Sequence, residues 1–109
     1  MRRVTLIGEG GLRLEIDVAE GRRERMRGLL RRARPPPGHG LLIPNARSVH
    51  SVGMRFPLDV AFLDEDLVVV EVAHLRPGRV LAPRRRARHL LECPAGSGPR
   101  RGERLRFGE

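Results

Sequence analysis

Apolar and polar residues alternate strictly over residues 12–18, a pattern typical of a strand with one buried face. A short apolar run at 4–7 precedes it, and the sequence Gly-Glu-Gly-Gly separates the two. Because glycine-rich turns connect hairpin strands, we predict that 4–7 and 12–19 pair as a hairpin. The apolar positions of the alternating run are Leu12, Leu14, Ile16 and Val18.

Further short apolar runs, bounded by Gly, Pro and Asp, predict five more strands. The strongest two are joined by the acidic turn Asp64-Glu65-Asp66. We interpret 45–57 as an irregular strand or loop and 76–88 as a Pro-punctuated connection. The five predicted strands are 40–44, 58–63, 67–75, 89–93 and 103–107.

The period changes over residues 21–33, where apolar residues recur at the spacing of one helix face. Three prolines at 35–37 end this segment, and we expect it to be the one substantial helix. Many short strands with Gly/Pro turns and one helix are typical of a β-sandwich or barrel. We therefore predict a mainly β fold, a single-domain (1–109) β-sandwich or partly open barrel of short antiparallel strands with one α-helix. The apolar helix positions are Met26, Leu29, Leu30 and Ala33.

Charge changes this picture by suggesting a partner. All 22 basic residues are arginines, and the formal net charge of the 109-residue chain is +9. An anionic ligand or a nucleic acid is therefore a candidate partner. Stacking aromatics, which a specific single-strand groove would need, are nearly absent, so we expect weak, nonspecific polyanion binding. Arginine richness also fits either heat adaptation or a GC-rich genome. The arginines cluster at 22–34, 84–88 and 100–106.

Cysteine and histidine usage predicts neither a disulfide nor a metal or other cofactor. Cys93 is the single cysteine, which favours a reducing compartment. His89 and Cys93 share a strand face but lie about 13 Å apart, too far to share one ion. The apolar run at 4–7 is too short for a signal peptide or a membrane span. We therefore expect a cytoplasmic protein with no membrane contact.

Several separate motifs occur in an order that resembles a known family. The chain is similar, from about residue 15 to 106, to the widespread bacterial and archaeal family known as domain of unknown function 192. The resemblance implies a compact β-sandwich or barrel with one helix and no established activity. "HSVGM" stands where many members have Trp-Met-Lys-Asn-Thr, and Leu67 stands near the place of a usual turn glycine. The motifs are "VAEGRRERMRGLLRR", "GHGLLIP", "HSVGMRFPLDVAFLDED", "LLECPAG" and "RRGERLRF".

The loop 45–57 is richest in chemically useful side chains and leads directly into the strand 58–63. Asp59 points to a rather apolar face of this strand, so its carboxylate needs hydrogen bonds or a cation. It either organises a pocket, with Arg55 and His50 nearby, or accepts backbone N–H bonds that pin the 50–57 loop. The candidate ligand-binding residues are Arg47, His50, Met54, Arg55 and Asp59.

Three function classes follow from these features. We favour a small binding module whose cleft beside loop 45–57 accepts an unknown small anionic ligand, a peptide or a protein. The alternative is a hydrolase-type enzyme that uses His50 and Asp59 as acid and base, which requires those groups within hydrogen-bond reach. A second alternative is an arginine-rich nonspecific nucleic-acid binder. If the arginines near loop 45–57 are consumed internally, the 76–88 connection is the next place to look.

Overall fold

The computed structural model describes residues 2–21, 35–47, 49–50 and 56–108. In these ranges the regular secondary structure consists of β-strands. The mainly β fold is therefore confirmed. Apart from Gly21, the helix predicted at 21–33 lies outside the described residues. The strands are β1 (Arg2–Gly8), β2 (Arg13–Val18), β3 (His39–Ile43), β4 (Val49–His50), β5 (Leu58–Leu63), β6 (Val69–Leu75), β7 (Val80–Leu81), β8 (His89–Pro94) and β9 (Leu105–Gly108).

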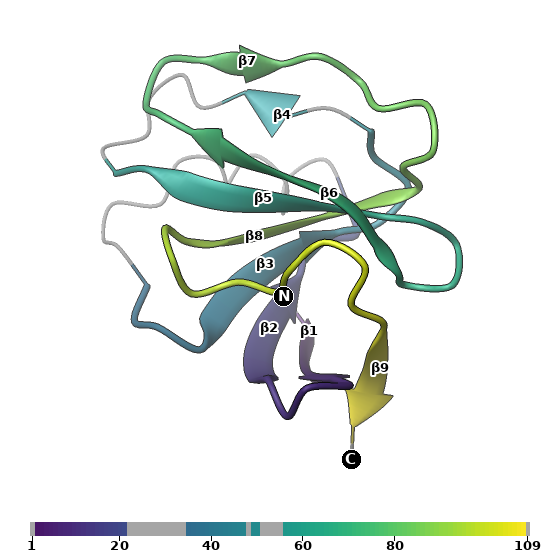
Figure 1. The fold of residues 1–109 in the computed structure, drawn as a ribbon. Coiled ribbons are helices and arrows are strands. Elements are labelled where there is room, and N and C mark those ends of the chain that lie inside the picture. Colours follow the sequence, from purple (N-terminus) through teal and green to yellow (C-terminus); the bar gives the residue numbers. More distant parts are fainter. Residues whose placement is uncertain (1, 22–34, 48, 51–55, 109) are drawn as a thin grey trace.

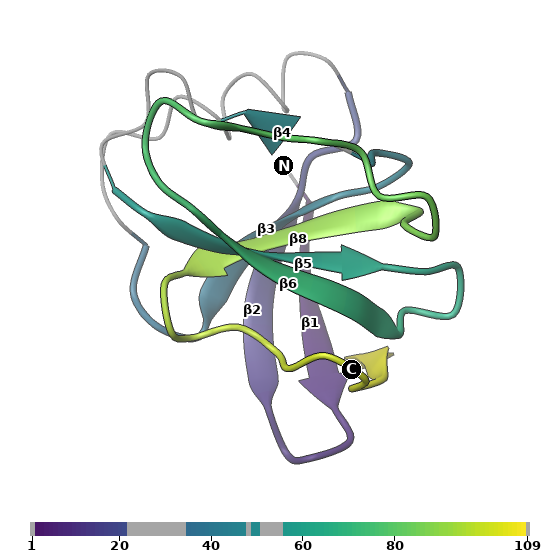
Figure 2. The ribbon, with the colours of Figure 1, turned by 45° about the horizontal axis from the view of Figure 1, so that its top comes forward.

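Seven of these strands form one sheet in the order β6-β5-β8-β3-β2-β1-β9, and β4 pairs separately with β7 (Figure 1). The large sheet curls, so that β1 and β2 run across the direction of β5 and β6 in both views (Figures 1 and 2). Of the two predicted architectures, this half-barrel corresponds to the partly open barrel. Its strand pairs are antiparallel except β2–β3, which is parallel. A parallel pair requires a crossover connection, which residues 19–38 supply.

Apolar side chains pack on both faces of the central strands. Neighbouring residues such as Val60 and Ala61 enter different core clusters, because successive side chains of a strand point to opposite faces. This explains why β3, β5 and β8 read as nearly continuous apolar runs. The hairpin strands β1 and β2 bury one face only, which produces the strict alternation seen in residues 12–18.

The structure departs from the predicted elements at three places. The small β4–β7 pair was not predicted, because two-residue strands at Val49–His50 and Val80–Leu81 are too short to show a period. Strand β6 starts at Val69 rather than residue 67, since Leu67 has a φ of 61° that no strand residue adopts. Strand β9 begins at Leu105 because 101–102 form a turn. In the described ranges there is no helix with the length and apolar character needed to span a bilayer.

Candidate functional site

Asp59 holds together the strands and the turn at one end of β5. Its Oδ1 lies 3.1 Å from Nδ1 of His74 on β6, and its Oδ2 accepts a 2.7 Å hydrogen bond from the Gly96 N–H. The Asp59 side chain is 22% exposed and pairs across the sheet with Cys93. The carboxylate therefore anchors a loop, as one interpretation expected, but the described loop is the turn after β8. Any contact with loop 51–55 lies outside the described residues.

The structure places two of the five candidate residues. Arg47 and Asp59 are described, whereas Met54, Arg55 and the side chain of His50 lie outside the described part. Asp59 lies near the start of β5, while Arg47 lines a cleft together with Asp64, just beyond the other end of that strand. The structure therefore does not bring Arg47 and Asp59 together.

Arg47 belongs to a cleft of about 300 Å³, here called the arginine cleft. Three chain segments meet there: the start of loop 45–57, the acidic turn after β5, and residues 84–88. The Arg84 N–H donates to the Arg47 carbonyl (3.4 Å), and the Arg88 N–H donates to the Leu63 carbonyl (2.7 Å). The guanidinium of Arg84 stacks 4.9 Å from the centre of the Phe62 ring. These contacts fix the backbone of the cleft. Its lining residues are Arg47, Asp64, Glu65, Asp66, Arg85, Arg86, Ala87 and Arg88.

The acidic residues of the arginine cleft are mostly engaged, while several arginines are not. Asp64 Oδ1 accepts the N–H groups of Asp66 and Val68 at 2.9 and 3.0 Å, and Glu65 pairs with Arg88 at 3.8 Å. Within the described ranges, no carboxylate pairs with Arg47, Arg85 or Arg86. The cleft therefore presents guanidinium donors that an anion could accept.

A second cavity, here called the apolar pocket, has a volume of about 280 Å³ and opens beside the arginine cleft. One of its walls is Leu67, whose φ of 61° lies in the left-handed region. That conformation costs a non-glycine residue about 1–2 kcal/mol. The pocket is lined by Arg2, Val18, Leu42, Pro44, Glu65, Leu67, His89 and Phe107.

His89 is the titratable group of this pocket. The Asn45 N–H donates to His89 Nδ1 at 3.1 Å, so the neutral ring carries its proton on Nε2. Burial lowers the pKa of His89 below its ordinary value of 6.5, and the charge of Arg88 lowers it further. His89 is therefore a neutral donor at pH 7.

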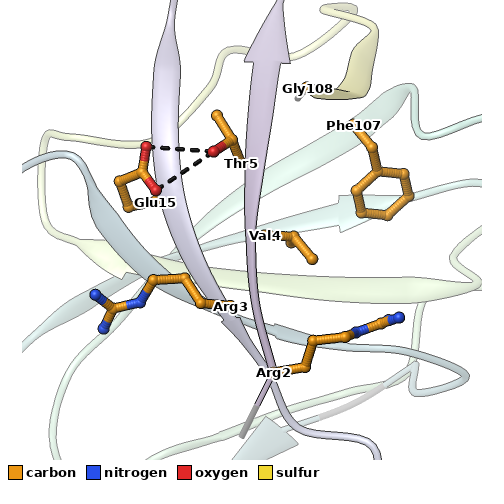
Figure 3. A pocket seen from close by; sticks show the side chains of 7 residues that line it. All are labelled: Arg2, Arg3, Val4, Thr5, Glu15, Phe107 and Gly108. Atoms are coloured by element: carbon orange, nitrogen blue, oxygen red, sulfur yellow. Dashed lines mark hydrogen bonds between the residues drawn. The ribbon is translucent and has the colours of Figure 1, made fainter.

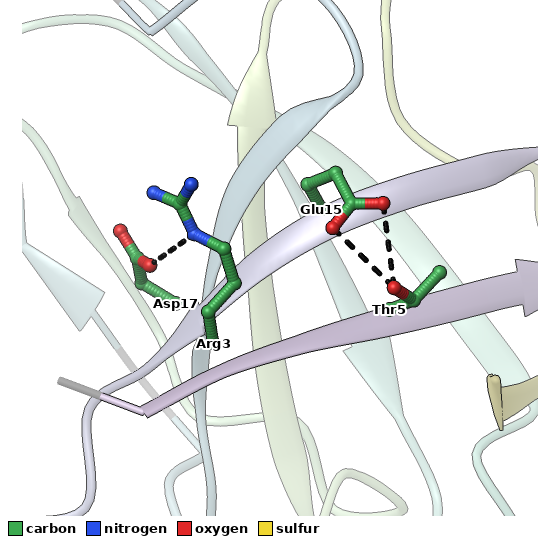
Figure 4. Close-up of polar contacts among 4 residues, drawn as sticks. All are labelled: Arg3, Thr5, Glu15 and Asp17. Atoms are coloured by element: carbon green, nitrogen blue, oxygen red, sulfur yellow. Dashed lines mark hydrogen bonds and ion pairs between the residues drawn. The ribbon is translucent and has the colours of Figure 1, made fainter. Parts of the chain in front are cut away.

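A third cavity, of about 360 Å³, lies beside β1 beyond the end of β9. Figure 3 shows Arg2 and Phe107 on one side of β1 and Arg3 and Glu15 on the other. The polar groups here are bound within the hairpin. Arg3 forms an ion pair with Asp17 at 3.1 Å, and the Thr5 hydroxyl donates a hydrogen bond to Glu15 at 3.3 Å (Figure 4). Arg2 pairs with Glu20 at 2.9 Å. This cavity therefore offers a ligand few uncommitted charges.

A fourth cleft, of about 790 Å³, lies between the β1–β2 turn and the loops that follow β8. The side chains of Ser97 and Glu103 are bound within their own loops. The Ser97 hydroxyl donates to the Pro94 carbonyl at 2.7 Å, and Glu103 Oε1 accepts the Arg100 N–H at 3.2 Å. Gly8 makes room for Glu103, since a Cβ on Gly8 would lie 2.0 Å from Glu103 Oε2. The cleft thus consists of loop-stabilising contacts.

Sequence reasoning did not single out Glu92, which is 3% exposed on the central strand β8. Its cross-strand partners are Leu41 and Val60, so it lies on an apolar face. The signal was a single acidic residue inside the apolar run 89–94. Cys93, the single cysteine, lies on the opposite face and is buried. No group of three His, Cys, Asp or Glu side chains in the described chain could hold a metal ion.

A model of DUF192, a family described as uncharacterized ACR, matches residues 4–105. The chain belongs to the DUF192 family. Curated relatives carry the name UPF0127: one from Pyrococcus abyssi is 39% identical over 67 residues, and one from Pyrococcus horikoshii is 43% identical over 49 residues. These alignments cover 55% and 45% of this chain, and 56% and 43% of the relatives. The chain thus spans about half the length of the curated relatives that it matches.

Two solved structures are similar to this DUF192 chain over nearly its whole length. A Sinorhizobium meliloti protein, described as a candidate transcription regulator, is 25% identical with a TM-score of 0.81, covering 96% of this chain and 92% of that one. A protein of unknown function from Novosphingobium aromaticivorans is 22% identical with a TM-score of 0.78, covering 95% and 83%. The second likeness supports the half-barrel fold of the family.

Proposed function

We propose that this protein is a binding module that accepts a small anion, a carboxylate or phosphate group, in the arginine cleft. The observation that carries the proposal is the presence of Arg47, Arg85 and Arg86 in one cleft without a carboxylate partner among the described residues. Guanidinium groups match such anions through paired hydrogen bonds.

The position of the cleft supports this function. It joins the start of the predicted recognition loop 45–57 to the 76–88 connection. The sequence indicated that connection as the alternative location of the binding site. The backbone bond between Arg84 and Arg47 fixes this junction. Function in small β domains is carried by loops that a rigid sheet positions, and both segments are anchored to the β5 end of the sheet.

Calorimetric titration with inorganic phosphate and with acetate, at constant ionic strength, tests the proposal. We expect Arg85→Gln combined with Arg86→Gln to weaken binding by roughly tenfold or more, because each charged hydrogen bond is worth about 1.5–3 kcal/mol before screening. Backbone amide shifts on titration should localise at 45–47 and 84–88.

The matched control is Arg101→Gln combined with Arg106→Gln, which removes the same charge from exposed positions outside the cleft. It should change the affinity less than about twofold, because screened charges beyond a Debye length act weakly. An equal loss in both double variants would show that net charge alone attracts the anion and would refute a built site.

A second candidate is nucleic-acid binding, supported by the description of the Sinorhizobium meliloti structure and by the net charge of +9. Charge without stacking aromatics predicts weak, salt-sensitive binding with no sequence preference. Fluorescence anisotropy with unrelated DNA duplexes at increasing salt measures this. Tight, sequence-dependent binding that persists at high salt would favour the nucleic-acid function over the small anion.

A further inference from the structure

The arginine cleft and the apolar pocket are neighbours, because Glu65 lines both. At the start of β8, Arg88 lines the cleft and the next residue, His89, lines the pocket. The segment 44–47 likewise contributes to both. The two cavities therefore adjoin at Glu65 and at the start of β8.

We propose that the ligand is an amphipathic carboxylic acid, with its carboxylate among the arginines of the cleft and its hydrocarbon chain in the apolar pocket. This inference rests on the proposed anion-binding function and names the class of anion.

The charges around the apolar pocket support this division of the ligand. Arg2 is paired with Glu20 at 2.9 Å, and Glu65 with Arg88 at 3.8 Å, so the charged groups of the pocket are matched. Among the described lining residues, His89 adds one neutral donor, and the walls beside these polar groups are Val18, Leu42, Pro44, Leu67 and Phe107. A ligand group inside the pocket should therefore be uncharged, and its charge belongs in the cleft.

Two residues of the pocket wall, Phe107 and Leu67, are in unfavourable states that the fold does not require. Phe107 is 52% exposed, although β9 holds its backbone opposite Leu6. Leu67 keeps a left-handed backbone, held by its N–H to the Asp64 carbonyl at 3.1 Å and by the Leu105 N–H to its own carbonyl at 2.9 Å. Glycine would satisfy the same turn without strain. What leucine adds is a side chain in the wall of the pocket, and strained residues of this kind cluster at ligand sites.

A series of straight-chain acids, from acetate through butyrate and hexanoate to octanoate, tests the inference by calorimetry on the whole chain. Each methylene that enters the pocket should raise the affinity by about fourfold. Octanol, which lacks the carboxylate, should bind at least about tenfold more weakly than octanoate, since it cannot use the arginines.

The variants Phe107→Ser and Leu67→Gly should flatten the dependence on chain length while leaving the affinity for acetate within about twofold. Phe107 is half exposed, so its replacement tests the pocket even if the Leu67 variant folds poorly. The matched control is Val80→Ser, which removes an exposed apolar side chain that lies outside the pocket. It should leave the chain-length dependence unchanged.

The outcomes separate the two proposals. If neither acetate nor phosphate binds, the anion-binding function itself fails. If acetate binds but affinity does not rise with chain length, or rises equally in the Phe107→Ser variant, the amphipathic ligand is refuted and the anion site stands. Octanol binding as tightly as octanoate would also refute the inference, because the carboxylate would then not occupy the cleft.

Discussion

The outer face of the β1–β2 hairpin and the arginine cleft both contain arginines and carboxylates. The arginine named below is paired with a carboxylate on the hairpin, whereas, among the described residues, the arginines named below in the cleft are not. On the hairpin, Arg3 and Asp17 face each other across two strands and pair at 3.1 Å. In the cleft, Arg85 and Arg86 are adjacent in a loop and have no carboxylate partner in the described chain. Cross-strand register brings opposite charges together, whereas a loop can present like charges side by side. Polar groups of the first kind stabilise the fold, and those of the second kind are available to a ligand.

The largest effect on stability should come from a carboxylate that is fully used by the fold. Asp59→Ala leaves the Gly96 N–H and the His74 ring without their acceptor. We expect a loss of about 1–3 kcal/mol in the free energy of unfolding, the net contribution of two hydrogen bonds at about 0.5–1.5 kcal/mol each. Urea denaturation measures it. An unchanged midpoint would mean that Asp59 does not anchor the turn.

The next effect concerns pH. The pKa of His89 is lowered in the folded protein, so the unfolded chain binds more protons between that lowered pKa and 6.5. Stability from this group is therefore complete above pH 6.5 and is lost as the pH falls through the lowered pKa. Chemical denaturation from pH 7.5 to 4.5 should show this slope in the wild type and a smaller one in His89→Asn. Equal slopes would contradict a partly buried His89 that is neutral in the folded protein.

A smaller effect is expected for the ion pair on the hairpin. A double-mutant cycle with Arg3→Ala and Asp17→Ala should give a coupling energy of about 0.2–1 kcal/mol, since both side chains are partly solvated. The coupling should shrink in high salt. A coupling energy of several kcal/mol would mean that this ion pair stabilises the fold as much as the Asp59 contacts do.

The smallest effect on stability should come from the arginine cleft itself. Arg85→Gln combined with Arg86→Gln should change the free energy of unfolding by no more than about 0.5 kcal/mol, as is usual for exposed positions without partners. Thermal melting beside the Arg101→Gln and Arg106→Gln control measures this. A loss comparable to that of Asp59→Ala would mean that these arginines belong to the fold, and the comparison would collapse.

The sequence predicted most of the large sheet because its strands carry strong local patterns. Alternation identified β2, and apolar runs identified β3, β5, β6 and β8. The pattern could not indicate that β2 and β3 pair in parallel, because register and direction depend on contacts between distant segments. The β4–β7 pair was not predicted because its two-residue strands are too short to show a period.

The candidate site was harder to predict, because it depends on which loops meet. Arg47 was named from its loop, but its neighbours Arg85 and Arg86 come from a segment that the sequence treated as a connection. Asp59 was expected to organise a pocket or to pin the loop 50–57, whereas its described partners, His74 and Gly96, lie on another strand and in another turn. The local sequence shows which side chains a loop carries, but which two loops come into contact is decided by the tertiary structure.

The pairing of β1 with β9 has a consequence for how the protein is made. Leu6 lies opposite Phe107, so β1 leaves the ribosome about 100 residues before the strand that completes its hydrogen bonds. Until residues 105–108 emerge, one edge of β1 remains open to other chains, a hazard for exposed strand edges during synthesis. Such long-range closure also slows folding. Shortening the chain before residue 105 should therefore raise aggregation during expression more than removing a loop of equal length.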